Sequence, residues 1–165
     1  MDWEDRTTVK KGNIGERIVK KYFESKGYVI YKCITEKAHA FDFLAVKDKK
    51  IFLIAEIKSK ARLNKYEATG INSRHYQEYL TIMENMKMDI ILFFVDEHPK
   101  EERIYCQRLS VLKTLKTVNK INFPNIQIAR DITLFSLADM IEVKKLNLEE
   151  LNELKLYSTR NYNYL

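Results

Sequence analysis

The stretch FDFLAVKDKKIFLIAEIKSK, residues 41–60, constrains the fold more than any other part of the chain. Residues 41–46 and 51–58 are two apolar runs of strand length around a charged turn, which is typical of a β-hairpin. Three charged residues nevertheless lie within or beside these runs: Asp42, Glu56 and Lys58. Because a buried charge without a partner is costly, the hairpin must provide a local reason for all three.

The direction of the side chains decides whether these charges can meet. Alternate residues of a strand face the same way, so Glu56 and Lys58 share one face, about 7 Å apart. Asp42 joins them if it lies opposite Glu56, because cross-strand partners point to the same side. A loop of two or four residues would pair Asp42 with Ala55 and send it to the other face. We therefore predict a three-residue loop, 48–50, which pairs Asp42 with Glu56.

Two adjacent carboxylates repel each other, and a bound divalent cation removes that cost. A set of oxygen ligands favours Mg²⁺ or Mn²⁺, ions that keep several waters and accept substrate phosphates. Lys58 beside the pair can orient water or stabilise negative charge, so the residues supply the parts for metal-assisted phosphodiester hydrolysis. The alternative is a salt-bridged hairpin in which Lys58 pairs with Glu56, since an isolated Glu-x-Lys tripeptide is common by chance.

The elements around the hairpin predict an α/β fold, in which a mixed central sheet carries helices on its faces. The residue patterns predict a helix over 13–27, a strand over 28–33, the hairpin, a helix over 72–87, and strands over 89–96 and 102–110. The charged segment between the hairpin and the second helix, residues 59–70, is interpreted as a loop.

Capping signals predict where several helices begin and end. Asn13, with Glu16 three residues later, reads as a capping box, and Gly27 as the C-terminal stop of the same helix. Asn147 with Glu150 forms a second capping box. The other C-terminal elements are predicted as a short helix over 109–118, edge strands within 126–136 and a helix after Ser136.

The 165 residues are expected to form one domain, with a core over about 12–110 and a C-terminal extension of helices and edge strands over about 111–165. No apolar run is long enough to span a bilayer, and the N-terminal sequence lacks the apolar stretch of a signal peptide. Cys33 and Cys106 lack a metal or disulfide spacing. We interpret them as buried free thiols and expect a cytoplasmic location.

The net charge of +6 is carried by the half of the chain that contains the hairpin. Residues 1–80 hold 17 Lys and Arg against 11 Asp and Glu, whereas residues 81–165 hold 12 of each. A positive field in this half favours a polyanion such as DNA or RNA. A lysine-rich surface without such a partner explains the same charge, so the charge alone leaves both interpretations open.

Glu16, Asp42 and the Glu-x-Lys of 56–58, in the order helix, strand, strand, resemble the PD-(D/E)xK nuclease superfamily, which has a restriction-endonuclease-like fold. The segments that carry the resemblance are GNIGERIVKKYF, AFDFLAV and FLIAEIKSK, within about residues 12–60. The helix and strand that follow also fit the common core of that superfamily. Phe41 stands where many members have proline, and the short motifs specify neither a subfamily nor a substrate.

The resemblance implies a role for each matching residue. It makes Asp42, Glu56 and the Ile57 carbonyl metal ligands, Lys58 the catalytic lysine and Glu16 the helical acid near the metal. Gln77 and Tyr79 are similar to a glutamine and a tyrosine that face the site in some members, although the segment HYQEY is not a clean match. The alternative is that Gln77 is exposed and its neighbours Tyr76 and Tyr79 lie in the core.

Three basic residues close to the proposed site are candidate contacts for nucleic-acid phosphates: Lys60, Arg62 and Arg74. A solvated surface is the alternative for each of them.

Together these features predict a Mg²⁺- or Mn²⁺-dependent deoxyribonuclease that acts on DNA in preference to RNA. The small chain leaves little room for a sequence-reading domain, which favours an endonuclease of low sequence specificity or one selective for a DNA structure. A nuclease of the Holliday-junction-resolvase kind needs two sites and therefore a homodimer. The alternatives are a non-catalytic nucleic-acid-binding module and a protein-interaction subunit on the same fold.

Overall fold

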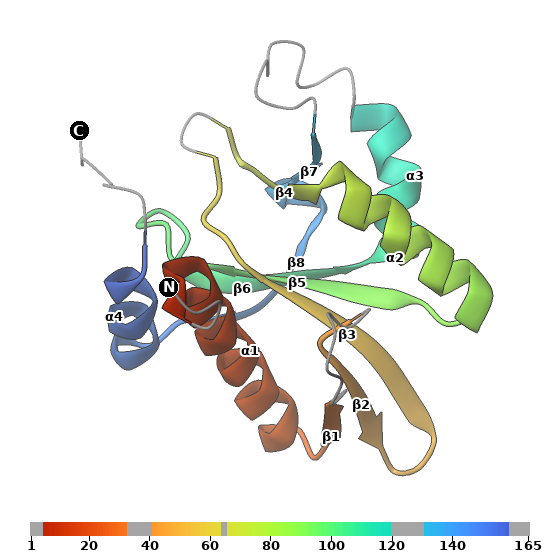
Figure 1. Ribbon diagram of the computed structural model, residues 1–165, viewed down its shortest axis with the longest axis horizontal. Coiled ribbons are helices and arrows are strands. Elements are labelled where there is room, and N and C mark those ends of the chain that lie inside the picture. The colour runs from red at the N-terminus through yellow and green to blue at the C-terminus, as the bar shows by residue number, and fades with distance from the viewer. Residues whose placement is uncertain (1–4, 33–40, 64–65, 120–130, 159–165) are drawn as a thin grey trace.

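A six-stranded mixed β-sheet with helices against both faces forms the body of the protein (Figure 1). The computed structural model describes residues 5–32, 41–63, 66–119 and 131–158. The strands of this sheet are β1 (Val29–Lys32), β2 (Phe43–Lys47), β3 (Ile51–Ser59), β5 (Ile90–Asp96), β6 (Arg103–Arg108) and β8 (Ile141–Lys145). A second sheet pairs β4 (Ala68–Asn72) with β7 (Ile132–Ser136), and the helices are α1 (Thr7–Ser25), α2 (Ser73–Met86), α3 (Leu109–Asn119) and α4 (Leu148–Leu156). The predicted α/β class with a mixed central sheet is confirmed.

The order of the strands brings the ends of two central strands to one edge of the sheet. The order is β1-β2-β3-β5-β6-β8, in which β3 and β5 are parallel and the other neighbours are antiparallel. The connection from β3 to β5 runs through β4 and α2. The C-terminal ends of β3 and β5 therefore lie side by side, at the edge where α/β sheets bind ligands.

Alternation along the strands divides the core between the two faces of the sheet. Phe43 and Ala55 belong to the cluster under α1 and α4, whereas Ile54 and Leu92 belong to the cluster under α2 and α3. Phe23 of α1 packs edge to face on Phe43, with 5.7 Å between the ring centroids. Consecutive residues of β3 thus contact opposite layers of helices.

The loop between β2 and β3 has the three residues that the sequence predicts. Phe43 lies opposite Ala55, so the preceding residue, Asp42, falls opposite Glu56. The first loop residue, Asp48, has a φ of 54°, as does the residue after it. These left-handed conformations let a short loop reverse the chain between the two strands.

Helix α1 begins at Thr7, earlier than the predicted cap at Asn13, and that prediction is wrong. Lys11, in the additional turns, forms an ion pair with the buried Glu97 beyond the end of β5. Such a tertiary contact outweighs a local capping signal, since packing supplies most of the stability of a helix in a protein. The predicted C-terminal stop is confirmed, because Gly27 has a φ of 82° directly after the helix.

Gly15 allows α1 to lie against the end of β3. A Cβ at this position would lie 1.8 Å from the Ser59 Oγ and 3.1 Å from the Ser59 Cβ. We therefore expect Gly15→Ala to lower the free energy of unfolding by about 1–3 kcal/mol, although alanine is the better helix former. Gly12→Ala is the matched control, since nothing lies within 4 Å of a Cβ there. It should raise the free energy of unfolding by about 0.5–1 kcal/mol, and equal effects in denaturant titrations would contradict the close packing at Gly15.

Two further predictions on secondary structure are wrong. Residues 68–72, mostly within the predicted loop, form β4 and pair with β7. After Ser136 the chain makes only the 3₁₀ turn Leu137–Asp139 and then enters β8, which pairs with β6. Both segments gain their hydrogen bonds from strands distant in the sequence, which a local pattern does not reveal. The predicted capping box of Asn147 at the start of α4 is confirmed.

Within the described ranges, no helix has both the length and the apolar character needed to cross a membrane. Cys106 of β6 is a half-buried free thiol, and burial raises its pKa to about 11. The prediction for Cys33 lies outside the described residues.

Candidate active site

The start of β2 and the end of β3 bring two carboxylates together. Asp42 directly precedes β2 and lies opposite Glu56 in the register of the hairpin. Its backbone N–H donates to the Ala55 carbonyl at 3.1 Å, and its Oδ2 accepts from the backbone N–H of Ile57 at 2.6 Å. The backbone of β3 therefore holds the Asp42 carboxylate beside the residue that follows Glu56.

Glu56 is buried, with 4% of its surface exposed, and faces α2. Its Oε1 accepts hydrogen bonds from the Tyr79 hydroxyl and from the Lys58 ammonium group. The Lys58 ammonium also lies over the Tyr79 ring, 5.7 Å from its centroid. The salt bridge that the sequence left as an alternative is therefore present, and it is formed beside the carboxylate of Asp42.

Tyr79, which the resemblance offered as a candidate together with Gln77, contacts the site through its hydroxyl. Its position on the inward face of α2 was predicted, but its hydroxyl reaches a carboxylate as well as the core. Burial raises the pKa of Tyr79, as does the nearby charge of Glu56, so the hydroxyl remains a donor. Gln77 has an exposed side chain on the same helix, and its role in the site stays a prediction.

Glu16 lies on α1 and at the border of the carboxylate pair. Its Oε2 accepts a hydrogen bond from the ammonium group of Lys32, the last residue of β1, at 3.0 Å. Its negative charge contributes to raising the pKa of Asp42, which places it within electrostatic reach of the pair. The sequence predicted Glu16 near the site but gave no reason to single out Lys32.

The surroundings of Asp42 disfavour its charged form. Burial is the largest cause, followed by the negative charge of Glu56, and together they raise the pKa of Asp42 from 3.8 to about 7. The hydrogen bond from Ile57 and the positive charge of Lys58 act in the opposite direction. A cation bound between the two carboxylates would remove the repulsion that the folded chain imposes on them.

The donor atoms at this position fit a hard divalent cation. Two carboxylates, from Asp42 and Glu56, and the carbonyl of Ile57 offer oxygen ligands, the type that Mg²⁺ and Mn²⁺ prefer. Within residues 5–32, 41–63, 66–119 and 131–158, no three His, Cys, Asp or Glu side chains converge to hold a metal. Mg²⁺ does not require three, since it is commonly held by one or two carboxylates together with waters and substrate phosphates.

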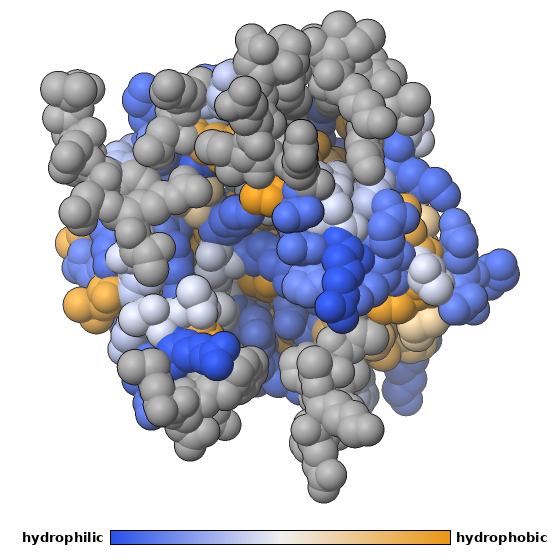
Figure 2. All heavy atoms as spheres, turned by 45° about the horizontal axis from the view of Figure 1, so that its top comes forward, coloured by the Kyte–Doolittle hydropathy of each residue, from blue (hydrophilic) through white to orange (hydrophobic). Residues whose placement is uncertain are grey.

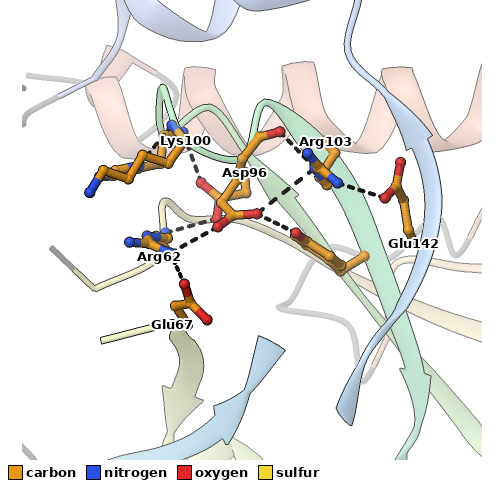
Figure 3. A network of polar contacts seen from close by, with 9 residues as sticks. Arg62, Glu67, Asp96, Lys100, Arg103 and Glu142 are labelled. Atoms are coloured by element: carbon orange, nitrogen blue, oxygen red, sulfur yellow. Dashed lines mark hydrogen bonds and ion pairs between the residues drawn. The ribbon is translucent and has the colours of Figure 1, made fainter. Parts of the chain in front are cut away.

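Arg62 lies in a buried position that disfavours a phosphate contact, and its role in nucleic-acid binding stays a prediction. The residue is buried, with 5% of its surface exposed, and its Nη1 lies 2.8 Å from Oε1 of Glu101. Figure 3 shows Arg62 within this network of polar contacts, near Asp96 and Glu67. Its backbone N–H donates to Asp96 at 3.1 Å, and Glu101 also accepts from the Tyr105 hydroxyl. This network ties the segment after β3 to the turn between β5 and β6. Sequence alone cannot distinguish a buried, paired arginine from an exposed one.

The other two predicted phosphate contacts are more accessible. Lys60 is half-buried, and its ammonium group donates to the Gly70 carbonyl at 3.2 Å. The side chain of Arg74 is 82% exposed at the start of α2 and pairs with Glu78 at 2.9 Å. Contact with a nucleic acid stays a prediction for both residues.

No protein-family model and no curated protein matches the chain. Among solved structures, the chain is similar to Hjc of Archaeoglobus fulgidus, a Holliday junction resolvase from an archaeal hyperthermophile. The TM-score is 0.53 at 11% sequence identity, and the match covers 79% of this chain and 95% of that one. This likeness shows the fold, which is restriction-endonuclease-like, as the order of Glu16, Asp42 and the Glu-x-Lys suggested.

Proposed function

We propose that this protein is a divalent-metal-dependent nuclease that hydrolyses DNA phosphodiester bonds, with Mg²⁺ or Mn²⁺ as its cofactor. The observation that carries the proposal is the register of the hairpin, which places Asp42 opposite Glu56 with Lys58 two residues further along. A purely structural hairpin has no use for a pair of carboxylates in which one pKa is raised to about 7 by burial and mutual repulsion. The likeness in fold to a Holliday junction resolvase adds support.

Each residue has a distinct part in the proposed reaction. Asp42, Glu56 and the Ile57 carbonyl would hold the cation, and Tyr79 fixes the Glu56 carboxylate by its hydrogen bond. The bound cation supplies charge stabilisation at the phosphodiester and a lower pKa of its water. Lys58, with 28% of its side chain exposed, stands between the buried carboxylate and solvent. From there it can orient a water molecule or stabilise negative charge on the substrate.

The surface of the protein suits a polar, anionic polymer. Hydrophilic residues predominate on the face shown in Figure 2, including around the hollow at its centre. The net charge of +6 favours nucleic acid, and Arg74 is accessible at the start of α2. We propose an endonuclease of low sequence specificity or one selective for branched DNA, and in the branched case a homodimer that supplies two sites.

A cleavage panel tests the proposal. Linear, nicked, branched and single-stranded DNA, with a matched RNA, are incubated with the purified protein in Mg²⁺, Mn²⁺ or EDTA. We expect cleavage of at least one DNA substrate with either metal, its loss in EDTA and its return when excess Mg²⁺ is added. Cleavage that resists EDTA would contradict the proposal. Binding without turnover on every substrate would favour a non-catalytic module instead.

A further inference from the structure

The two lysines that border the carboxylates are both bound to them. The Lys58 ammonium donates to Glu56, and the Lys32 ammonium lies 3.0 Å from Oε2 of Glu16. In each pair the lysine is the more exposed partner, with 28% of the Lys58 side chain exposed against 6% for Glu56, and 49% for Lys32 against 20% for Glu16. Each ammonium group therefore covers a less accessible carboxylate.

The lysines approach from opposite faces of the sheet. Lys58 lies on the face of α2, where its ammonium group contacts the Tyr79 ring. Lys32 is the cross-strand partner of Phe43, whose side chain packs under α1, and its ammonium group reaches Glu16 on that helix. The strands thus place one ammonium group on each face of the sheet, near the strand ends that carry Asp42 and Glu56.

Two of the three carboxylates of the site are already paired with an ammonium group within the protein. Glu56 and Glu16 each have a lysine, and Asp42 accepts a hydrogen bond from the Ile57 N–H. A carboxylate that binds an ammonium group attracts a second cation less strongly, because part of its charge is neutralised. Any divalent cation that uses Glu56 has to compete with Lys58 for the same oxygen.

We propose that Lys58 and Lys32 are resident counter-cations of this site, and that they leave Glu56 and Glu16 when a divalent cation binds. This inference rests on the proposed function, because it assigns the cation to Asp42 and Glu56 and adds Glu16, the nearby acid, to the groups that the cation affects. Once displaced, the ammonium groups are available to the phosphates of a nucleic acid. The two binding events are then coupled. A nucleic acid whose phosphates bind these ammonium groups raises the affinity of the site for the cation.

The affinity for Mn²⁺ without nucleic acid tests the inference directly. Calorimetric titrations with MnCl₂ at about pH 8 compare the wild type with Lys58→Met and Lys32→Met, which keep most of the apolar volume and lose the charge. We expect Lys58→Met to bind Mn²⁺ about tenfold more tightly and Lys32→Met about threefold more tightly, because an internal competitor is gone. Lys58→Arg and Lys32→Arg keep the charge and should bind as the wild type does.

Two controls separate direct competition from a general change in charge. Lys60→Met removes a charge two residues from Lys58, but the Lys60 ammonium donates to the Gly70 carbonyl. Lys113→Met removes a half-exposed lysine that pairs with Glu84 at 3.2 Å, an ion pair much like that of Lys32 but formed between α3 and α2. Both should change the affinity for Mn²⁺ by less than about twofold. Thermal melts of every variant confirm that the titrated protein is folded.

The outcomes distinguish this inference from the proposed function. If the wild type binds Mn²⁺ and cleaves DNA while Lys58→Met binds Mn²⁺ no more tightly, the inference is overturned and the proposed function stands. An equal gain in Lys60→Met also overturns it, since long-range charge then explains the effect. If the wild type neither binds Mn²⁺ nor cleaves any substrate, both fail. A gain in Lys58→Met that Lys58→Arg reverses supports the exchange.

Discussion

Replacing Asp42 with asparagine is expected to reduce metal-dependent DNA cleavage by about a thousandfold or more. The amide keeps the shape of the side chain and an oxygen for the Ile57 N–H, but it removes a charged ligand from a cation that stabilises the transition state. Single-turnover cleavage in Mg²⁺ measures the loss. Asp48→Asn is the matched control, because Asp48 is exposed in the loop of the same hairpin and should leave cleavage unchanged.

The stability of the Asp42→Asn variant gives an independent readout. The pKa of Asp42 is raised from 3.8 to about 7, so the folded protein binds a proton more tightly than the unfolded chain. Without metal, this group therefore stabilises the fold at low pH, and that contribution is lost as the pH rises through about 7. Asp42→Asn should weaken the fall in unfolding free energy between pH 4 and 7. Cleavage within about tenfold of the wild type would exclude Asp42 as a ligand.

Replacing Arg62 with methionine is expected to lower the free energy of unfolding by about 3–5 kcal/mol, the cost of breaking a buried ion pair. Glu101 would keep its buried position, where 12% of its side chain is exposed, without the guanidinium at 2.8 Å. The segment that follows Lys58 would keep the backbone hydrogen bond from residue 62 to Asp96 but lose its side-chain link to Glu101 in the turn after β5. Denaturant unfolding measures the change.

Arg74→Met is the matched control for Arg62, since it removes the same charge from a side chain that is 82% exposed. Its free energy of unfolding should stay within about 0.5 kcal/mol of the wild type. In DNA-binding titrations over a range of salt, Arg74→Met should reduce the dependence on salt by about one phosphate contact, and Arg62→Met should not. A reduced salt dependence in Arg62→Met, with little loss of stability, would show that Arg62 is accessible after all.

The parts of the fold that the sequence predicted are those with a strong local signal. The apolar runs of the hairpin, the alternation that pairs Asp42 with Glu56, and the glycine at position 27 each follow from the geometry of a single element. The strands β4 and β8 escaped prediction because their stability comes from pairing with β7 and β6, which are distant in sequence. The early start of α1 has the same origin, since it depends on Lys11 meeting Glu97.

The residues of the candidate site also divide into those with a local signal in the sequence and those that depend on tertiary packing. The carboxylates and Lys58 were predicted because their charges interrupt apolar strands, where charge needs an explanation. The positions of Tyr79, Lys32 and Arg62 depend on how helices and loops pack around the sheet. The resemblance of HYQEY to the family offered Tyr79 as a candidate, but only the packing of α2 against β3 shows that its hydroxyl contacts Glu56. No comparable signal distinguishes the buried Arg62 from the exposed Arg74.

The length of the hairpin loop, three residues, sets the register of β2 and β3 and therefore the geometry of the site. Apart from the left-handed backbone at Asp48 and Lys49, which disfavours β-branched side chains, the identities of these exposed residues are free to change. The length of the loop is not, because one inserted or deleted residue reverses the side of the sheet to which Asp42 points. Most surface loops accept insertions more readily than a buried aspartate accepts replacement. In this hairpin we expect the opposite. A change in the length of the loop, about 17 Å from the carboxylates, should disrupt the site as much as the loss of one carboxylate does.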